Sequence, residues 1–269
     1  MTKTALIAGA GALPTQIVAV LRDKPFIAAL EGHAPRGIAV DLKFRVERLV
    51  PFLEHLHDQG VTAVCFAGAV QRPRLDPALF DPRTAQMVPR LMMAMRGGDD
   101  ATLREVIAIF EEAGFAILGV DQIAPALVPG EGVICGAPGE QDRADAERAA
   151  AIVAALGAVD VGQGTVVQQG LCLAVEALPG TDAMLRLAAT IPLALRPDAS
   201  RGRGLFYKAP KPGQDRRIDL PTLGPETVNR VADAGLGGIV WQAGGVITLD
   251  LPEMTRQAEA QGIFLWARA

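Results

Sequence analysis

The stretch Thr4-Ala-Leu-Ile-Ala8, followed at once by Gly9-Ala10-Gly11, decides how the fold of this chain is interpreted. The short apolar run predicts a buried strand, and the glycines after it predict a tight turn. Leu13 to Leu21 then has helical periodicity, and Pro14 suits the first turn of a helix. A strand, a glycine turn and a helix in this order predict the opening of a Rossmann-like α/β unit.

The alternation continues through the first half of the chain. Apolar runs predict strands at 26–30, 37–42, 61–67 and 115–120, and helical spacing predicts helices at 43–59 and 101–113. We expect Asp99 or Asp100 to cap the second of these helices, and prolines to break residues 71–100 into short helical pieces. Strands that alternate with helices imply right-handed crossovers and a largely parallel sheet. The first half therefore predicts a Rossmann-like domain at residues 1–130.

A loose stretch rich in proline and glycine predicts a linker at residues 131–140, and the domain after it, 141–269, has a different pattern. Helices are predicted at 141–156, 181–187, 225–234 and 252–261, and strands at 204–209 and 263–267. Hairpins are predicted at 164–177 and at 238–249, where glycine-containing turns interrupt apolar runs. The fold class is therefore α/β, with an N-terminal parallel sheet and a C-terminal mixed domain.

Composition limits the classes of function. Half of the 269 residues are apolar and the net charge is −4, as expected of a globular protein with one or two domains. No basic tail is present and aromatic residues are few, so we expect no nucleic-acid partner. The three cysteines lie in no metal or redox spacing, which predicts reduced thiols in a cytoplasm. No apolar run is long enough to span a bilayer, which still permits contact with a membrane surface.

The glycine turn after the first strand is half of a dinucleotide-binding fingerprint. Glu31 follows the second strand, where the ribose-binding acid of an NAD site belongs. The third glycine of the fingerprint is missing, and Pro14 stands in its place. An NAD(P)-dependent oxidoreductase and a plain tight turn are therefore both open interpretations of this stretch.

Histidine and serine chemistry have no support in the sequence. The three histidines lie in no ligand spacing, and neither a G-x-S-x-G motif nor a P-loop occurs. Carboxylates do occur at predicted loops and turns, with basic residues near them in sequence, most densely in the stretch from Lys208 to Gly224. Such oxygen-rich, basic sites suit Mg²⁺ or Mn²⁺ and the phosphates of a substrate. A non-catalytic protein that binds a nucleotide sugar or a lipid stays open as a third interpretation.

Motifs spread over nearly the whole chain carry a family resemblance. They are Leu6-Ile-Ala-Gly-Ala-Gly-Ala-Leu-Pro14, Val64-Cys-Phe-Ala-Gly68 with Arg72-Pro73, Gly98-Asp99-Asp100 with Leu103-Arg104, Asp160-Val-Gly-Gln163-Gly164, Ala174-Val-Glu176-Ala, Gly180-Thr-Asp182-Ala-Met-Leu-Arg186 and Lys208 through Gly224. In this order they resemble the LpxI-type UDP-2,3-diacylglucosamine pyrophosphatases of lipid A biosynthesis. The last two motifs are far more specific than the glycine turn.

The resemblance implies a hydrolase of two α/β domains that cleaves UDP-2,3-diacylglucosamine into 2,3-diacylglucosamine 1-phosphate (lipid X) and UMP. It implies a requirement for Mg²⁺, with Mn²⁺ or Co²⁺ as substitutes, and water attack on the phosphorus on the sugar side. Asp219 is the implied catalytic residue, and Asp219, Asp182 and Glu176 are candidate metal ligands. The implied substrate contacts are Gly9, Gly11, Arg72, Asp100, Arg104, Gln163, Thr181, Lys208, Lys211, Gln214 and Arg217.

Two further expectations follow from the resemblance. Many relatives carry Asn within Ala-Gly-Asn-Val where this chain has Ala69, so any polar contact of that Asn is absent here or supplied otherwise. A lipid substrate implies a cytoplasmic protein in transient contact with the inner membrane surface. The sequence leaves the oligomeric state open, a homodimer included.

Overall fold

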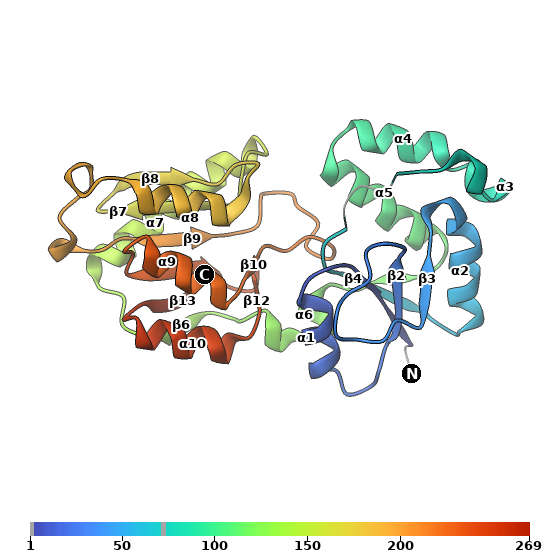
Figure 1. Cartoon of the computed structure of the whole chain (residues 1–269), viewed down its shortest axis with the longest axis horizontal. Coiled ribbons are helices and arrows are strands. Elements are labelled where there is room, and N and C mark those ends of the chain that lie inside the picture. The colour runs from blue at the N-terminus through green and yellow to red at the C-terminus, as the bar shows by residue number, and fades with distance from the viewer. Residues whose placement is uncertain (1–2, 71–73) are drawn as a thin grey trace. The chain divides into compact units, whose positions relative to one another are not determined.

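The computed structural model describes residues 3–70 and 74–269, and its tertiary contacts divide the chain into two units (Figure 1). The N-terminal unit runs to Pro125 and also takes Arg217–Asp219. The C-terminal unit consists of Ala126–Arg216 and Leu220–Ala269. Within the described residues, no helix has the length and apolar character that crossing a bilayer would require.

The N-terminal unit is built on a five-stranded sheet in the order β3-β2-β1-β4-β5. Its strands are β1 (Thr4–Ala8), β2 (Phe26–Leu30), β3 (Leu42–Phe44), β4 (Ala63–Ala67) and β5 (Ala116–Ile117), and all neighbours are parallel. The central strands β1 and β4 are apolar except for Thr4 at the start of β1, because parallel sheets are covered on both faces. The predicted Rossmann-like parallel sheet is confirmed.

The helices of this unit follow the strands with shifted boundaries. They are α1 (Leu13–Val20), α2 (Leu49–Asp58), α3 (Pro82–Ala85), α4 (Val88–Arg96), α5 (Asp99–Glu112) and α6 (Val120–Ile123), with short 3₁₀ turns η1 (Val46–Arg48), η2 (Pro77–Leu79) and η3 (Pro125–Leu127). The strand predicted at 37–42 begins only at Leu42, so the helix predicted from Lys43 begins at Leu49. The N-cap of α5 is Gly98, and the prediction that Asp99 or Asp100 caps it is wrong.

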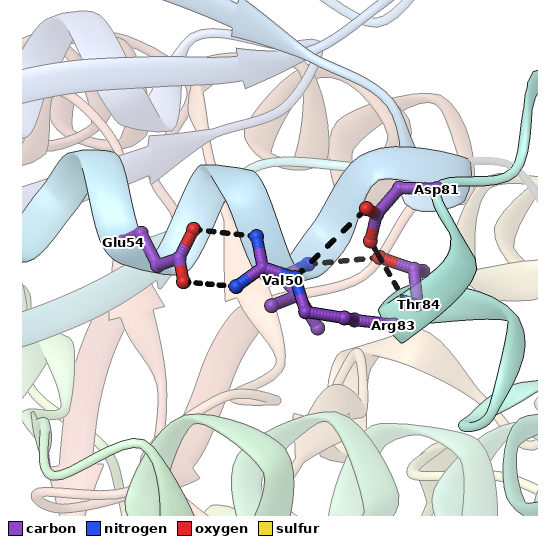
Figure 2. Close-up of polar contacts among 5 residues, drawn as sticks. All are labelled: Val50, Glu54, Asp81, Arg83 and Thr84. Carbon is purple, nitrogen blue, oxygen red and sulfur yellow. Dashed lines mark hydrogen bonds and ion pairs between the residues drawn. The ribbon is translucent and has the colours of Figure 1, made fainter.

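A small polar network fixes α3 against α2 (Figure 2). Asp81 caps α3 by accepting a hydrogen bond from the Thr84 N–H at 2.9 Å, and the buried Thr84 hydroxyl accepts one from the Val50 N–H at 3.0 Å. The two terminal guanidinium nitrogens of Arg83, Nη1 and Nη2, donate to the two carboxylate oxygens of Glu54, with the Nη2–Oε2 pair at 2.7 Å. These contacts give a four-residue helix a defined position, which its own few backbone hydrogen bonds would not.

The C-terminal unit is built on a six-stranded mixed sheet in the order β6-β13-β11-β9-β7-β8. Its strands are β6 (Gly132–Cys135), β7 (Gly164–Gln168), β8 (Leu171–Val175), β9 (Leu205–Lys208), β11 (Gly238–Gln242) and β13 (Phe264–Arg268). The strands β9, β11 and β13 are parallel, whereas β6, β7 and β8 are antiparallel to their neighbours. A separate parallel pair joins β10 (Thr222–Leu223) to β12 (Ile247–Thr248). The predicted mixed α/β domain is confirmed.

Helices cover both faces of this sheet. They are α7 (Glu140–Ala158), α8 (Gly180–Thr190), α9 (Pro225–Asp233) and α10 (Leu251–Ala260), with 3₁₀ turns η4 (Leu193–Leu195) and η5 (Ala199–Arg201) between α8 and β9. Successive residues of a strand pack on opposite faces, as a pleated sheet requires. On β9, Phe206 packs into the core shared with α8, α9 and α10, whereas Leu205 and Tyr207 pack into the core shared with α7.

Two predictions for this unit are wrong. The stretch predicted as a linker, 131–140, contains β6, which pairs with β13 at one edge of the sheet. The hairpin predicted at 238–249 does not form, because β11 pairs with β9 and β13 while β12 pairs with β10 in another sheet. The hairpin predicted at 164–177 is confirmed as β7 and β8.

Candidate functional site

The glycine turn after β1 is joined to the turn after β4 by backbone hydrogen bonds. The N–H of Ala10 donates to the Ala69 carbonyl and the N–H of Ala69 donates to the Ala10 carbonyl, both at 2.8 Å. A Cβ on Gly9 would lie 2.6 Å from the Ala69 oxygen, so only glycine fits there. The strand order reverses between β1 and β4, and ligands of open α/β sheets bind beyond the strand ends at such a switch point.

Ala69, where the resemblance led us to expect Asn, makes its hydrogen bonds through its main chain. The backbone N–H and carbonyl of Ala69 both hydrogen-bond to Ala10, while the Ala69 side chain is exposed and adds no polar group. Glu31, the candidate ribose-binding acid, instead forms an ion pair with Arg45 at 2.8 Å. Pro14 lies in the first turn of α1 and removes one of the N–H groups that would face a phosphate. These features give the NAD interpretation no support beyond the glycines themselves.

Two predicted basic residues gather with α5 in the N-terminal unit. Arg217 forms an ion pair with Glu111 of α5 at 2.7 Å, and a Cβ on Gly119, just after β5, would lie 3.4 Å from the Arg217 Cα. Arg104 is exposed on α5, seven residues before Glu111 and therefore on the same side of the helix. Asp219, which belongs to the same unit, is exposed. Arg217 and Asp219 thus lie in the part of this unit that includes the carboxyl end of β5.

The side chains of two predicted substrate contacts, Arg72 and Asp100, lie outside the part of the chain that the structure describes. Arg72 lies outside the described residues, and the side chain of Asp100 does as well, although its backbone begins α5. Gly11 follows β1 with a φ of +101°, and a Cβ added to it would meet no other atom within 4 Å, so the conformation of this turn rather than crowding favours glycine.

The C-terminal unit buries a charged network at the carboxyl end of β9. Lys208 is 5% exposed and Glu176 is 6% exposed, and Thr181 links them. The Lys208 Nζ donates to the Thr181 hydroxyl oxygen at 2.6 Å, and that hydroxyl donates to the Glu176 Oε2 at 2.8 Å. Lys208 also donates to the Thr222 carbonyl at 3.3 Å. A buried charge is costly unless it is hydrogen-bonded and compensated, and this chain of contacts supplies both conditions.

Sheet pairing and one helix bring these three residues together. Gly164 of β7 pairs with Lys208 of β9, and the Glu176 N–H donates to the Gly164 carbonyl at 2.8 Å. Thr181 is the second residue of α8, so its hydroxyl meets the network at the positive end of the helix dipole. Tyr207, which precedes Lys208, packs on the other face, and burial raises the pKa of its phenol.

A second, exposed ion pair lies beyond the end of β9. The Lys211 Nζ is 2.6 Å from the Asp160 Oδ1, and the Gln214 side chain accepts a hydrogen bond from the Lys211 N–H at 2.9 Å. Gln163 has a buried side-chain oxygen without a hydrogen-bond donor among the described residues. Asp160 belongs to one of the sequence motifs but is not among the predicted site residues. Its φ of +58°, unusual for a residue other than glycine, is visible only in the structure.

The carboxylates predicted as metal ligands belong to both units, with Asp219 in the N-terminal unit and Asp182 and Glu176 in the C-terminal unit. Among the residues that the structure describes, no three of His, Cys, Asp and Glu are grouped as metal ligands would be. Asp182 is exposed in the first turn of α8, and Glu176 already accepts the Thr181 hydroxyl. Mg²⁺ usually takes one or two carboxylates and completes its shell with waters and substrate phosphates. Asp182 and Asp219 are exposed, each in its own unit, whereas Glu176 is buried and already hydrogen-bonded and is therefore the least available of the three.

Comparisons with known proteins cover almost the whole chain. The model of the LpxI N-terminal domain matches residues 3–127, and the model of the LpxI C-terminal domain matches residues 130–266. The chain is 38% identical over 277 residues to a protein of Caulobacter vibrioides named UDP-2,3-diacylglucosamine pyrophosphatase LpxI, covering 98% of this chain and 97% of that protein. The chain therefore belongs to the LpxI family.

Proposed function

We propose that this protein hydrolyses the diphosphate of UDP-2,3-diacylglucosamine to 2,3-diacylglucosamine 1-phosphate and UMP, a step of lipid A biosynthesis. Similarity to the named relative over nearly the whole length supports the substrate. The observation that carries the proposal is the buried Lys208, held at a strand end by Thr181 and Glu176. An ammonium fixed in a site of low dielectric stabilises developing phosphate charge more than a mobile surface lysine can.

The basic residues divide into a fixed group and exchangeable groups. Lys208 is held by hydrogen bonds in the interior and lies with the N-terminus of α8, where two sources of positive potential favour an anion. Lys211 and Arg217 form exposed ion pairs, which are worth little in water. Each of these two can leave its carboxylate for a substrate phosphate at small cost.

Asp219 is the proposed catalytic carboxylate. It would accept a proton from water, or orient it, as the water oxygen attacks the phosphorus on the sugar side. The new P–O bond forms as the bond to the bridging oxygen breaks, and UMP leaves with that oxygen. A bound Mg²⁺ would lower the negative charge on the diphosphate. Asp219 in the N-terminal unit, and Asp182 and Glu176 in the C-terminal unit, are each a candidate ligand within their own unit.

The central test is release of UMP from UDP-2,3-diacylglucosamine by the purified protein, with Mg²⁺, Mn²⁺ or Co²⁺ or after chelation. We expect turnover that needs a divalent ion, and no release with any of the three would refute the hydrolase. In ¹⁸O-labelled water the label should enter the sugar phosphate rather than UMP. Asp219→Ala should abolish turnover but retain substrate binding, whereas wild-type rates would remove Asp219 from the chemistry. Tight NAD(H) binding without hydrolysis would favour an oxidoreductase.

A lipid substrate also suggests a cytoplasmic protein in transient contact with the inner membrane surface. We expect weak co-sedimentation with vesicles that contain the substrate. Light scattering at several protein concentrations decides between a monomer and a homodimer.

A further inference from the structure

Four aliphatic side chains are exposed at the end of the C-terminal sheet where Lys208 is buried. Val159 is 69% exposed, Val161 43%, Val175 40% and Leu178 100%. We call these four residues the aliphatic rim. Single exposed aliphatic residues are normal on protein surfaces, but several in one place indicate a binding surface.

Strand pairing brings the two segments of the rim together. Val175 at the end of β8 is paired with Thr165 of β7, and the Glu176 N–H donates to the Gly164 carbonyl. A Cβ on Gly162 would lie 2.0 Å from the Glu176 oxygen, so the backbones of the two segments are in contact there. Val159 and Val161 therefore approach the segment that carries Val175 and Leu178.

The rim is continuous with the charged network. Leu178 lies in the short connection between Glu176 and Thr181, the two residues that hold Lys208. On the other segment, Asp160 lies between Val159 and Val161 and pairs with Lys211. The residues that bind the two lysines and the exposed aliphatic residues thus lie on the same two neighbouring backbone segments, which is the arrangement that an amphipathic anion requires.

We propose that the aliphatic rim receives the acyl chains of the substrate while Lys208 and Lys211 face its diphosphate. This inference rests on the proposed function and adds to it the part of the surface that recognises the lipid. The position of the rim favours acyl chains over a second copy of this chain, because the exposed residues flank the charged network on both segments. Contact with an acyl chain removes the aliphatic surface from water and so adds affinity.

The test compares UDP-2,3-diacylglucosamine bearing long acyl chains with an analogue bearing acetyl groups. For the double variant Val159→Ser/Leu178→Ser we expect KM for the long-chain substrate to rise about tenfold or more, with kcat unchanged. Kinetics on the acetyl analogue should stay as in the wild type. The matched control is Leu193→Ser in η4, where the leucine is 83% exposed. Leu193 lies close in sequence to Arg196, which bonds to Gln168 at the opposite end of β7 from Gly164 and therefore away from the rim. The KM of the Leu193→Ser variant for the long-chain substrate should therefore equal that of the wild type.

Several outcomes would overturn the inference. An unchanged long-chain KM would remove the rim from acyl recognition, and so would an equal KM rise on the acetyl analogue. A wild-type dimer that the double variant converts to a monomer would assign the rim to a second copy. Loss of binding to substrate-free phospholipid vesicles would assign it to the membrane. If the wild type hydrolyses neither substrate, the proposed function fails, and titration of the protein with long-chain sugar phosphate then tests the rim by itself.

Discussion

Two lysines three residues apart, at the end of β9, belong to opposite environments. Lys208 is buried, and its ammonium is bonded to Thr181 and to the Thr222 carbonyl. Lys211 belongs to a largely exposed pair with Asp160, whose side chain is 77% exposed. Both were predicted from sequence as diphosphate contacts, and nothing in their residue type separates them.

The two lysines differ because burial removes the water that would otherwise compensate the charge of an ammonium group. Around Lys208 few waters remain to compensate the ammonium, so hydrogen-bonded protein groups must do so, and they fix its position. Around Lys211 water screens the charge, so the ion pair is weak and its partner can be exchanged. We therefore expect Lys208 to contribute to stability and catalysis together, and Lys211 to contribute mainly to substrate affinity.

The largest effect is expected from Lys208→Met. Loss of the fixed ammonium should lower kcat about 10³-fold, as the loss of a preorganised electrostatic group does. It should also lower the free energy of unfolding by about 3 kcal/mol, because Glu176 then remains buried without that cation. Steady-state kinetics and urea unfolding measure the two effects. Adding Glu176→Gln should restore part of the stability and none of the activity; no restoration would mean that the two residues are not coupled.

A smaller effect is expected from Thr181→Val, which keeps the shape and removes the hydroxyl that links Lys208 to Glu176. Leaving both groups without this partner should cost about 1–3 kcal/mol of stability and lower kcat at least tenfold. Thr181→Ser retains the hydroxyl and is the control. If Ser and Val behave alike, the hydroxyl is not the link that the geometry indicates.

Cys65 and Cys172 also differ in burial, and this difference predicts that the free energy of unfolding depends on pH. Burial raises the pKa of the Cys65 thiol to about 12, whereas Cys172 is exposed. An unfolded thiol ionises near pH 8.5, so between about pH 8.5 and 12 the folded chain keeps a proton that the unfolded chain loses. Below about pH 8.5 the Cys65 thiol should not affect the free energy of unfolding. As the pH rises from there toward about 12, the free energy of unfolding should fall, by about 2 kcal/mol at pH 10.

Unfolding of the wild type and of Cys65→Ala between pH 7 and pH 10 measures this effect. The variant should lose less stability over that range, and equal slopes would contradict the prediction. In the native protein at pH 8, a thiol reagent should label Cys172 rapidly and the buried Cys65 and Cys135 only on unfolding.

The smallest effect is expected from Lys211→Ala. An exposed pair contributes little, so the free energy of unfolding should change by less than about 0.5 kcal/mol. KM should rise a few-fold at low salt, and the difference from the wild type should shrink as salt screens the charge. Asp160→Asn is the companion variant, because it frees Lys211 from its partner and should leave KM equal or lower. A large loss of stability in either variant would mean that Lys211, like Lys208, is a fixed part of the folded structure and not an exchangeable surface charge.

Much of the architecture was predictable from local pattern. The run from Thr4 to Gly11 predicted a strand and a turn that both form, and the apolar runs at 26–30 and 61–67 predicted the neighbouring strands. Burial on both faces makes these strands almost wholly apolar, and this signal lies within a few residues. The resemblance that named the family likewise depends on short motifs in order.

Pairing over long distances was not predictable in the same way. The strand β6 lies in a stretch rich in glycine and joins the sheet only through β13, more than a hundred residues later. The run at 238–249 has the turn residues of a hairpin, yet β11 and β12 pair with different partners. Periodicity reports which residues of a strand are buried, but it does not report which other strand will lie beside it.

By itself, the sequence determined the α/β class, the family and the set of charged residues that bear on function. Only the tertiary structure decided that Glu176, Thr181 and Lys208 form one buried chain of hydrogen bonds and that Asp160 pairs with Lys211. The physical reason is that propensity and motif act over a few residues, whereas the environment of a charge depends on everything packed around it. Two lysines of the same loop motif thus differ in burial because β9 and its neighbours enclose one of them and not the other.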